Sequence, residues 1–211
     1  TSAEYVQALR TAGVPLATGE NGTYWIGYGS RVVQRFPTFH VGAPSEPEID
    51  RALGTTGALV ATYLVEPDDR RPANACLYLC RDHDYTLDRL SPAMRRNVRR
   101  ALRELTVSPL SAAEVLQHGA EAFCETRRRT GLDDGTAEGF RNYFAHRVER
   151  RGGCYLRASR AGRLGAFITI VHVDDWAELT CFSMDSLLAF CPIAALLYLA
   201  LWHFLVRLTS P

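Results

Sequence analysis

Five arginine side chains fall within nine residues of this chain, at Arg95, Arg96, Arg99, Arg100 and Arg103. A guanidinium group stays charged and donates paired hydrogen bonds to phosphate oxygens, so such a cluster can bind a polyanion. A charged helix face is commonly just solvated, but like charges this close repel one another unless anions or carboxylates neutralise them. The cluster therefore predicts a phosphate-binding surface, with RNA or another polyanion as a possible partner.

The same segment predicts the helix that would present these arginines. Ser91 can cap a helix whose first residue is Pro92, and both types favour those positions. Apolar residues then recur at helical spacing and would face the protein interior. They are Met94, Val98, Ala101, Leu102 and Leu105. We therefore expect a basic amphipathic helix over residues 91–106.

The overall composition excludes some catalytic mechanisms and some classes of protein. All 24 basic residues are arginine, so a Schiff-base lysine and a Walker-type phosphate loop are both excluded. The chain is 47% apolar and 22% charged, which is ordinary for a globular protein and excludes collagen-like and disordered classes. The formal net charge is only +1, so a polyanion would have to meet a local patch rather than the whole molecule.

The cysteines and the N-terminus point to an intracellular protein without a metal. The six cysteines contain no C-x-x-C pair, and several lie in apolar runs, which indicates buried reduced thiols. No second pair of ligands is spaced to complete a zinc site. The N-terminal residues lack the basic and apolar regions of a signal peptide. These patterns predict a cytoplasmic protein with no metal site.

The remaining elements follow from hydrophobic periodicity and turn residues. In the first 90 residues we expect a helix that begins after Ser2 and stops at Gly13. We then expect a hairpin, a short helix and two further strands, over residues 23–28 and 31–36, 49–53, 58–65 and 76–81. After the basic helix we expect two helices and a three-stranded meander, over residues 112–129, 140–150, 154–159, 164–173 and 176–184. Adjacent strands favour antiparallel pairing, so the predicted fold class is α+β with mostly antiparallel sheets.

Residues 187–206 form an apolar run of 20 residues without a formal charge. That length could span a membrane. However, Pro192 belongs in the first turn of a helix, and Tyr198 and His203 would then lie in its middle rather than at its edges. We therefore expect a buried core helix, with Tyr198 and His203 as core residues, and membrane association through this helix stays as an alternative.

Three segments together resemble the FemAB-like branch of the GNAT acyltransferase superfamily. They read LSPAMRRNVRRALRELTV over residues 90–107, FCETRRRTGL over 123–132 and GCYLRASRAGRLGAFITIVHVDDWAELTCFSMD over 153–185. The resemblance implies two GNAT-like units, each with a central, mostly antiparallel sheet. Residues 1–90 would form a shortened N-terminal unit, 91–106 a basic connecting helix, and 107–211 a C-terminal unit that looks incomplete at its end.

The resemblance also implies a function, the transfer of an acyl or aminoacyl group to an amine. The donor would be acyl-CoA or aminoacyl-tRNA, and the acceptor a small-molecule or glycan amine. In such a fold a backbone N–H holds the donor carbonyl oxygen, and positioning provides most of the catalysis. No fixed triad is expected, and the catalytic base remains unknown, with Glu178 as a weak candidate. Asp174 and Asp175 are interpreted as turn residues.

One departure from the family pattern bears on the donor. An acyl-CoA enzyme would carry a glycine-containing phosphate loop between the third strand of the meander and the last helix. Residues 183–192 contain no glycine, although Ser183 and Ser186 could still meet an anion. This departure leaves open a second hypothesis, a non-catalytic anion-binding or scaffold domain with a degenerate GNAT fold. The acceptor and the oligomeric state are not predicted.

Overall fold

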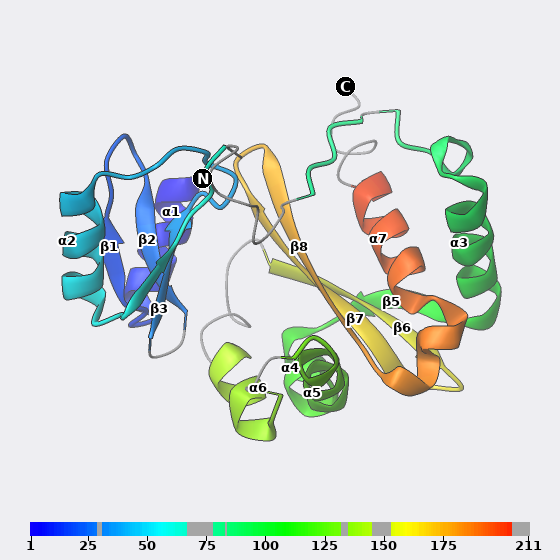
Figure 1. Cartoon of the computed structure of the whole chain (residues 1–211). Coiled ribbons are helices and arrows are strands. Elements are labelled where there is room, and N and C mark those ends of the chain that lie inside the picture. Colours follow the sequence, from blue (N-terminus) through cyan, green and yellow to red (C-terminus); the bar gives the residue numbers. More distant parts are fainter. Residues whose placement is uncertain (29–30, 67–77, 83, 132–134, 145–152, 204–211) are drawn as a thin grey trace. The chain divides into compact units, whose positions relative to one another are not determined.

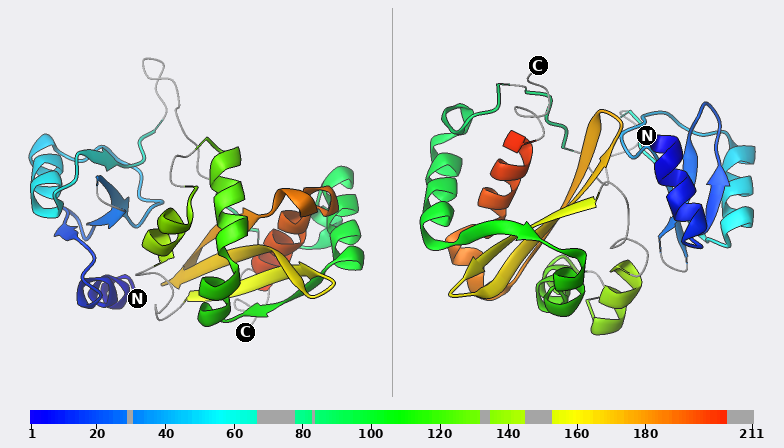
Figure 2. Two further views of the ribbon diagram at one scale, coloured as in Figure 1. Left: turned by 90° about the horizontal axis from the view of Figure 1, so that it is seen from below. Right: turned by 180° about the vertical axis from the view of Figure 1, so that it is seen from behind.

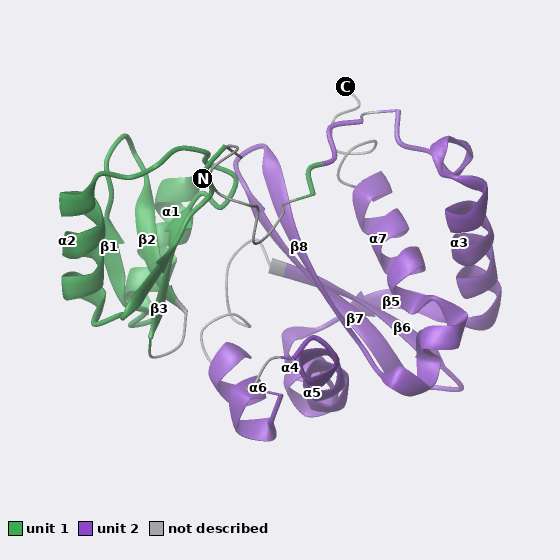
Figure 3. Cartoon of the chain, viewed as in Figure 1, with its two compact units in different colours: residues 1–79 green, residues 80–211 purple. Residues whose placement is uncertain are grey.

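The computed structural model describes residues 1–28, 31–66, 78–82, 84–131, 135–144 and 153–203. The chain divides into two compact units, Thr1–Leu79 and Cys80–Pro211 (Figure 3). Each unit has its own four-stranded sheet and helices, which confirms the predicted α+β class. The basic helix belongs to the second unit by this division.

Unit 1 is a small sheet with two helices. Its elements are α1 Ser2–Thr11, β1 Leu16–Thr18, β2 Tyr24–Tyr28, β3 Val32–Phe36, α2 Glu46–Thr56 and β4 Val60–Thr62. The strand order is β1-β2-β3-β4, and the predicted hairpin is the antiparallel pair β2 and β3. Strand β4 joins the sheet in parallel to β3. Helix α2 is longer than expected because Ser45 caps it and Pro47 lies in its first turn.

A buried polar cluster fixes α2 to this sheet. Glu48, only 1% exposed, accepts a hydrogen bond of 2.8 Å from the Trp25 indole and lies 3.9 Å from the Arg35 guanidinium. Arg35 is 5% exposed and also donates to the Gly42 carbonyl at 2.8 Å. Within the described residues, Glu48 Oε2 and Arg35 Nε have no hydrogen-bond partner. The buried negative charge of Glu48 and the buried positive charge of Arg35 are therefore neutralised mainly by each other.

The strand predicted over residues 76–81 is wrong for the part that the structure describes. Residues 78–81 are irregular, and residues 76 and 77 lie outside the described residues. Tyr78 is 91% exposed and Leu79 60% exposed. The alternating pattern predicted a strand, but no neighbouring strand is available to hydrogen-bond with this segment in the described part of the chain.

Unit 2 is an antiparallel sheet with helices on both faces (Figures 1 and 2). After η1 Leu87–Arg89, its elements are α3 Pro92–Glu104, β5 Thr106–Leu110, α4 Ala112–His118, α5 Ala120–Arg129, α6 Ala137–Phe144, β6 Gly153–Arg160, β7 Arg163–Val173, β8 Trp176–Ser183, η2 Asp185–Phe190 and α7 Pro192–Trp202. The strand order β5-β6-β7-β8 contains the predicted meander of β6, β7 and β8.

The helix predicted over residues 112–129 is instead two helices, α4 and α5, which meet at Gly119. A Cβ atom at Gly119 would lie 2.7 Å from the Val115 carbonyl and 3.1 Å from the Phe167 ring. Only glycine therefore fits at this position without a shift of its neighbours. The helix predicted over 140–150 is observed as α6, and residues 145–150 lie outside the described residues.

The two faces of the sheet bury separate cores. On one face, α4, α5 and α6 surround an aromatic core that includes Phe123, Phe144, Phe167 and Phe182. On the other face, α7 packs against the sheet and α3 packs against α7 (Figure 1). Helix α7 begins at Pro192, as expected. Within the described residues, no helix has both the length and the apolar character needed to cross a membrane.

The prediction of uniformly buried thiols is wrong for two of the five described cysteines. Cys80 and Cys154 are exposed, whereas Cys124, Cys181 and Cys191 are partly buried. Cys181 lies on β8 beneath α7, and burial raises the pKa of its thiol to about 12. Cys76 lies outside the described residues.

Candidate functional site

Helix α3 forms where the sequence predicts it and turns its apolar side inward. The Ser91 hydroxyl accepts a hydrogen bond of 3.3 Å from the Met94 amide, and Pro92 is the first helical residue. Val98 and Ala101 are fully buried, since this side of α3 packs against α7. Met94 and Leu102 lie at the margins of this apolar side and are about two-fifths exposed. The arginines occupy the remaining circumference of the helix.

Arg95 differs from the other arginines because it is half-buried and bound within the protein. Its guanidinium lies 3.4 Å from the Asp88 carboxylate and donates to the Leu90 carbonyl at 3.3 Å. These contacts hold the segment before α3 against the helix. Arg95 therefore has a structural explanation that requires no ligand.

The other four arginines are exposed, and we call them the four-arginine face (Arg96, Arg99, Arg100 and Arg103). In the described part of the chain, no carboxylate lies within 4.0 Å of any of them. Arg100 contacts the Phe190 ring, with its guanidinium carbon 5.8 Å from the ring centre. The arrangement concentrates four uncompensated positive charges over about two turns of α3, which is suited to a polyanion.

The connection from β8 to α7 is the place where the resemblance implies a phosphate loop. Here it forms the short helix η2, and its first backbone N–H groups are already occupied. Ser183 N donates to Thr126 Oγ1 at 2.8 Å, Met184 N to the Gly165 carbonyl at 2.8 Å, and Asp185 N to Glu125 Oε2 at 2.6 Å. These three amides cannot also bind a pyrophosphate, so the start of this connection does not offer its main-chain donors to a ligand.

The structure does not bring Ser183 and Ser186 into one site. Ser183 is buried, and its hydroxyl accepts a hydrogen bond of 3.0 Å from Arg129, which also pairs with Asp185. Ser186 is exposed on η2. Sequence reasoning missed Arg129, since its partners lie more than 50 residues further along the chain.

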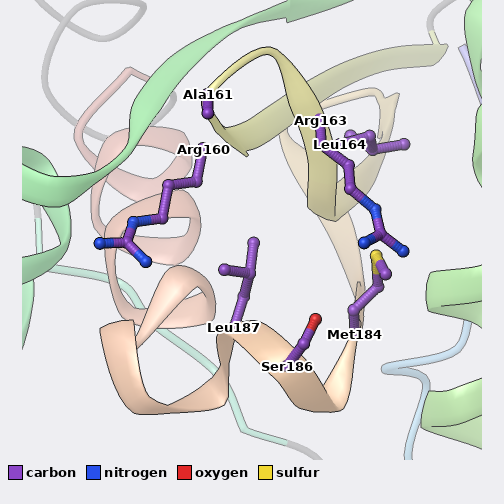
Figure 4. A pocket seen from close by; sticks show the side chains of 7 residues that line it. All are labelled: Arg160, Ala161, Arg163, Leu164, Met184, Ser186 and Leu187. Carbon is purple, nitrogen blue, oxygen red and sulfur yellow. The ribbon is translucent and has the colours of Figure 1, made fainter.

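Ser186 lines a cavity of about 440 Å³ at one end of the sheet (Figure 4). Its lining residues are Arg160, Ala161, Arg163, Leu164, Met184, Ser186 and Leu187. Sequence reasoning also missed Arg160 and Arg163. A signal was present, because the two-residue turn at Ala161 and Gly162 places the two arginines directly opposite each other in the hairpin.

Gly165 shapes the floor of this cavity and yields a testable expectation. A Cβ atom at Gly165 would overlap Leu187 Cδ1 and lie 2.8 Å from Leu187 Cγ, so Leu187 would have to leave its buried position. We expect Gly165→Ala to lower the free energy of unfolding by about 1–3 kcal/mol through overpacking. Urea unfolding of the full chain measures this change.

Gly54→Ala is the matched control for that substitution. Gly54 is exposed in α2, and a Cβ atom there would have no neighbour within 4 Å. Alanine should stabilise this helix slightly, by about 0.5–1 kcal/mol. If the two variants had equal stability, the close packing of Leu187 on Gly165 would be refuted.

The structure fixes the register that the sequence left open for Glu178. On β8 it lies opposite Val171 and is half-buried. Alternation along the strand places Glu178 on the same face as Phe182, the face covered by α4, α5 and α6. Glu178 therefore lies across the sheet from α3, and its role as a base stays a prediction.

Tyr198 of α7 lies beside a second phenol, and the distance between its ring centre and that of Tyr85 is 5.9 Å. Burial raises the pKa of Tyr85, and the neighbouring Cys80 and Tyr198 raise it further. A phenol with a raised pKa stays protonated at neutral pH, so it donates hydrogen bonds rather than acting as a base. Tyr198 is half-buried, as expected of a core residue, whereas His203 is exposed.

Comparisons with known proteins support the fold but not a family. No protein-family model and no curated protein sequence matches the chain. Its structure is similar to that of FemX, with a TM-score of 0.55 at 10% sequence identity over 95% of this chain and 79% of FemX. It is also similar to the C-terminal domain of a candidate lysylphosphatidylglycerol synthetase from Agrobacterium fabrum, with a TM-score of 0.50 at 12% identity over 97% of this chain and 73% of that one. At such identities the similarity establishes a shared fold alone.

Proposed function

We propose that this protein transfers an aminoacyl group from an RNA-linked ester to an amine acceptor. The four-arginine face carries the proposal, because it lies on a fold similar to that of FemX and offers four exposed positive charges to a nucleic-acid backbone. The similarity to a domain of a candidate lysylphosphatidylglycerol synthetase supports only the coarser part of the proposal, an aminoacyl group as the group transferred. The acceptor would be a small-molecule or glycan amine.

The β8–α7 connection favours an RNA-linked donor over acyl-CoA. A coenzyme A pyrophosphate is commonly held by free main-chain N–H groups at a helix N-terminus. The amides of Ser183, Met184 and Asp185 are bound within the protein, and no glycine lies in this connection. A polynucleotide needs no such loop, because exposed arginines can neutralise its phosphates directly.

The reaction itself requires only aligned reactants and one proton transfer. The acceptor nitrogen attacks the ester carbonyl, a C–N bond forms, and the C–O bond to the ribose breaks. The amine loses a proton, and the departing ribose oxygen gains one. Glu178 is our candidate for the group that accepts the amine proton, since carboxylates can act as general bases.

Transfer to an amine can be measured directly. The full chain is incubated with a mixture of tRNAs charged with radiolabelled amino acids and with a panel of small amines and amino sugars. The expected product keeps its label after mild alkali, because an amide survives conditions that hydrolyse the ester. Acetyl-CoA with the same acceptors is the comparison donor. Transfer from acetyl-CoA but not from charged tRNA would overturn the proposed donor.

The occupied amides at the end of β8 also favour a second candidate, a non-catalytic polyanion-binding domain. If RNA binds to the four-arginine face but no label reaches any acceptor, this second function replaces the first. The two candidate functions therefore share the four-arginine face as their RNA-binding surface. They differ only in whether aminoacyl transfer follows binding.

A further inference from the structure

We infer that the RNA-binding surface extends beyond α3 to Arg160 at the end of β6, and that Phe190 positions two of its arginines. This extension of the surface rests on the proposed function, because it takes an RNA strand as the ligand. It adds to the four-arginine face a cation from a second element and an aromatic ring from a third, η2.

Phe190, the last residue of η2, contacts one arginine from each of two other elements. The guanidinium carbon of Arg160 lies 4.0 Å from the centre of the ring, and that of Arg100 on α3 lies 5.8 Å from it. The ring is half-buried and packs against the core that α7 covers, so its position is fixed. A cation is attracted to the electrons of an aromatic face. Phe190 therefore brings together two cations from distant parts of the sequence.

The spacing of charged residues along α3 leads toward Arg160. Arg96, Arg100 and Glu104 follow one another at intervals of four residues, so they form one row on the helix. Helix α3 also packs against η2. Glu104 is the last residue of α3, and its Oε2 lies 3.7 Å from Arg160 Nη2. Arg160 therefore continues the row beyond the C-terminal end of α3.

Arg160 remains available to a ligand. Its side chain is about half exposed, and among the described residues its guanidinium group donates no hydrogen bond. The distance to Glu104 is longer than a hydrogen bond, and an ion pair between two half-exposed side chains contributes little to stability. A guanidinium group that lies over a ring keeps its N–H groups at its edge, where they can donate to phosphate oxygens. The contacts of Arg160 thus orient its donors without using them.

Arg163 provides a contrast within the same hairpin. It lies opposite Arg160 in the pairing of β6 and β7, but Figure 4 shows the two guanidinium groups extended in opposite directions. Arg163 Nη2 lies 2.9 and 3.0 Å from the two carboxylate oxygens of Glu121 on α5, one of the helices on the other face of the sheet. Arg163 is therefore held away from the four-arginine face and serves as the matched control for Arg160.

Binding of labelled tRNA to the full chain, measured across a series of salt concentrations, tests the extended surface. We expect Arg160→Gln to weaken binding about three- to fivefold at low salt, because one phosphate contact is lost. The slope of log K against log salt should fall by about 0.7–0.9. Arg163→Gln removes the same charge from the same hairpin and should change neither quantity.

The role of the Phe190 ring is tested by two substitutions. Phe190→Leu should weaken tRNA binding about two- to threefold, whereas Phe190→Tyr keeps the ring and should bind tRNA as the wild type does. In a chain that already carries Arg100→Gln and Arg160→Gln, Phe190→Leu should have no further effect, since the ring then has no arginine to position. A general loss of stability would weaken binding in that background as well.

The carboxylate beside Arg160 gives an independent test. Glu104→Gln removes its negative charge and should tighten tRNA binding about two- to threefold. Glu121→Gln makes the matched change beside Arg163 and should leave the affinity unchanged.

Equal losses of affinity in Arg160→Gln and Arg163→Gln would overturn the extended surface, and equal losses in Phe190→Leu and Phe190→Tyr would overturn the positioning role of the ring. The transfer assay separates these results from the proposed function. Aminoacyl transfer together with unchanged tRNA binding in Arg160→Gln would refute the extended surface and leave the transferase intact. The expected loss of binding in Arg160→Gln, without transfer by the wild type, would support the surface and refute the transferase.

Discussion

Replacement of all four residues of the four-arginine face by glutamine is expected to lower the affinity for tRNA by about two to three orders of magnitude at low salt. Each arginine that contacts a phosphate releases counterions, and it contributes about 0.7–0.9 to the slope of log K against log salt. Four contacts should therefore account for a slope of about 3. Fluorescence anisotropy with labelled tRNA across a series of salt concentrations measures both quantities.

The control for this variant carries the same loss of charge at exposed arginines on other parts of the chain. Suitable positions are Arg10, Arg31, Arg81 and Arg141, each replaced by glutamine. This control should keep most of the affinity and of the salt dependence. An equal loss of binding in both variants would show that only the total charge matters, and would contradict a localised binding face.

Glu48→Gln is expected to lower the free energy of unfolding of unit 1 by about 3–5 kcal/mol. Glutamine can still accept the hydrogen bond from Trp25, but Arg35 would be left as a buried cation with only the Gly42 carbonyl. An uncompensated charge in a buried position costs far more than the pair contributes. Urea unfolding followed by tryptophan fluorescence detects the change, because Trp25 is fully buried in this unit.

Arg51→Gln tests the same chemistry at the surface of the same unit. Arg51 lies 3.8 Å from Glu20, and both side chains are about half exposed, so the loss should be about 0–1 kcal/mol. Replacement of Glu48 and Arg35 together by apolar residues should cost less than Glu48→Gln alone, since no lone charge remains. The buried pair would have no special role if Glu48→Gln and Arg51→Gln had equal effects.

The local signals in the sequence predicted much of the fold. The β2–β3 hairpin, the β6–β8 meander, the capped start of α3 and the start of α7 at Pro192 were all predicted from turn, cap and periodicity patterns. The break at Gly119 was missed, because it depends on the approach of the Phe167 ring from a distant strand. The strand predicted over residues 76–81 was wrong for residues 78–81, because an alternating pattern forms a strand only where a neighbouring strand can hydrogen-bond to it.

The candidate site was less predictable, because side-chain partners come from distant parts of the chain. The sequence located the arginines of α3 but could not separate Arg95, which is bound to Asp88 and Leu90, from the four that are exposed. The sequence also grouped Ser183 with Ser186 as two residues that could meet an anion. In the structure Arg129 binds Ser183, whereas Ser186 lines the cavity.

Helix α7 is apolar around its whole circumference because it has a partner on each side, the sheet on one and α3 on the other. Of the elements that the structure describes, it is also the last that a ribosome would synthesise. Until α7 is complete, the inner side of α3 and one whole face of the sheet remain exposed to water. A chain that ends before α7 would therefore expose apolar surface that the complete unit buries, and it would be more prone to aggregation.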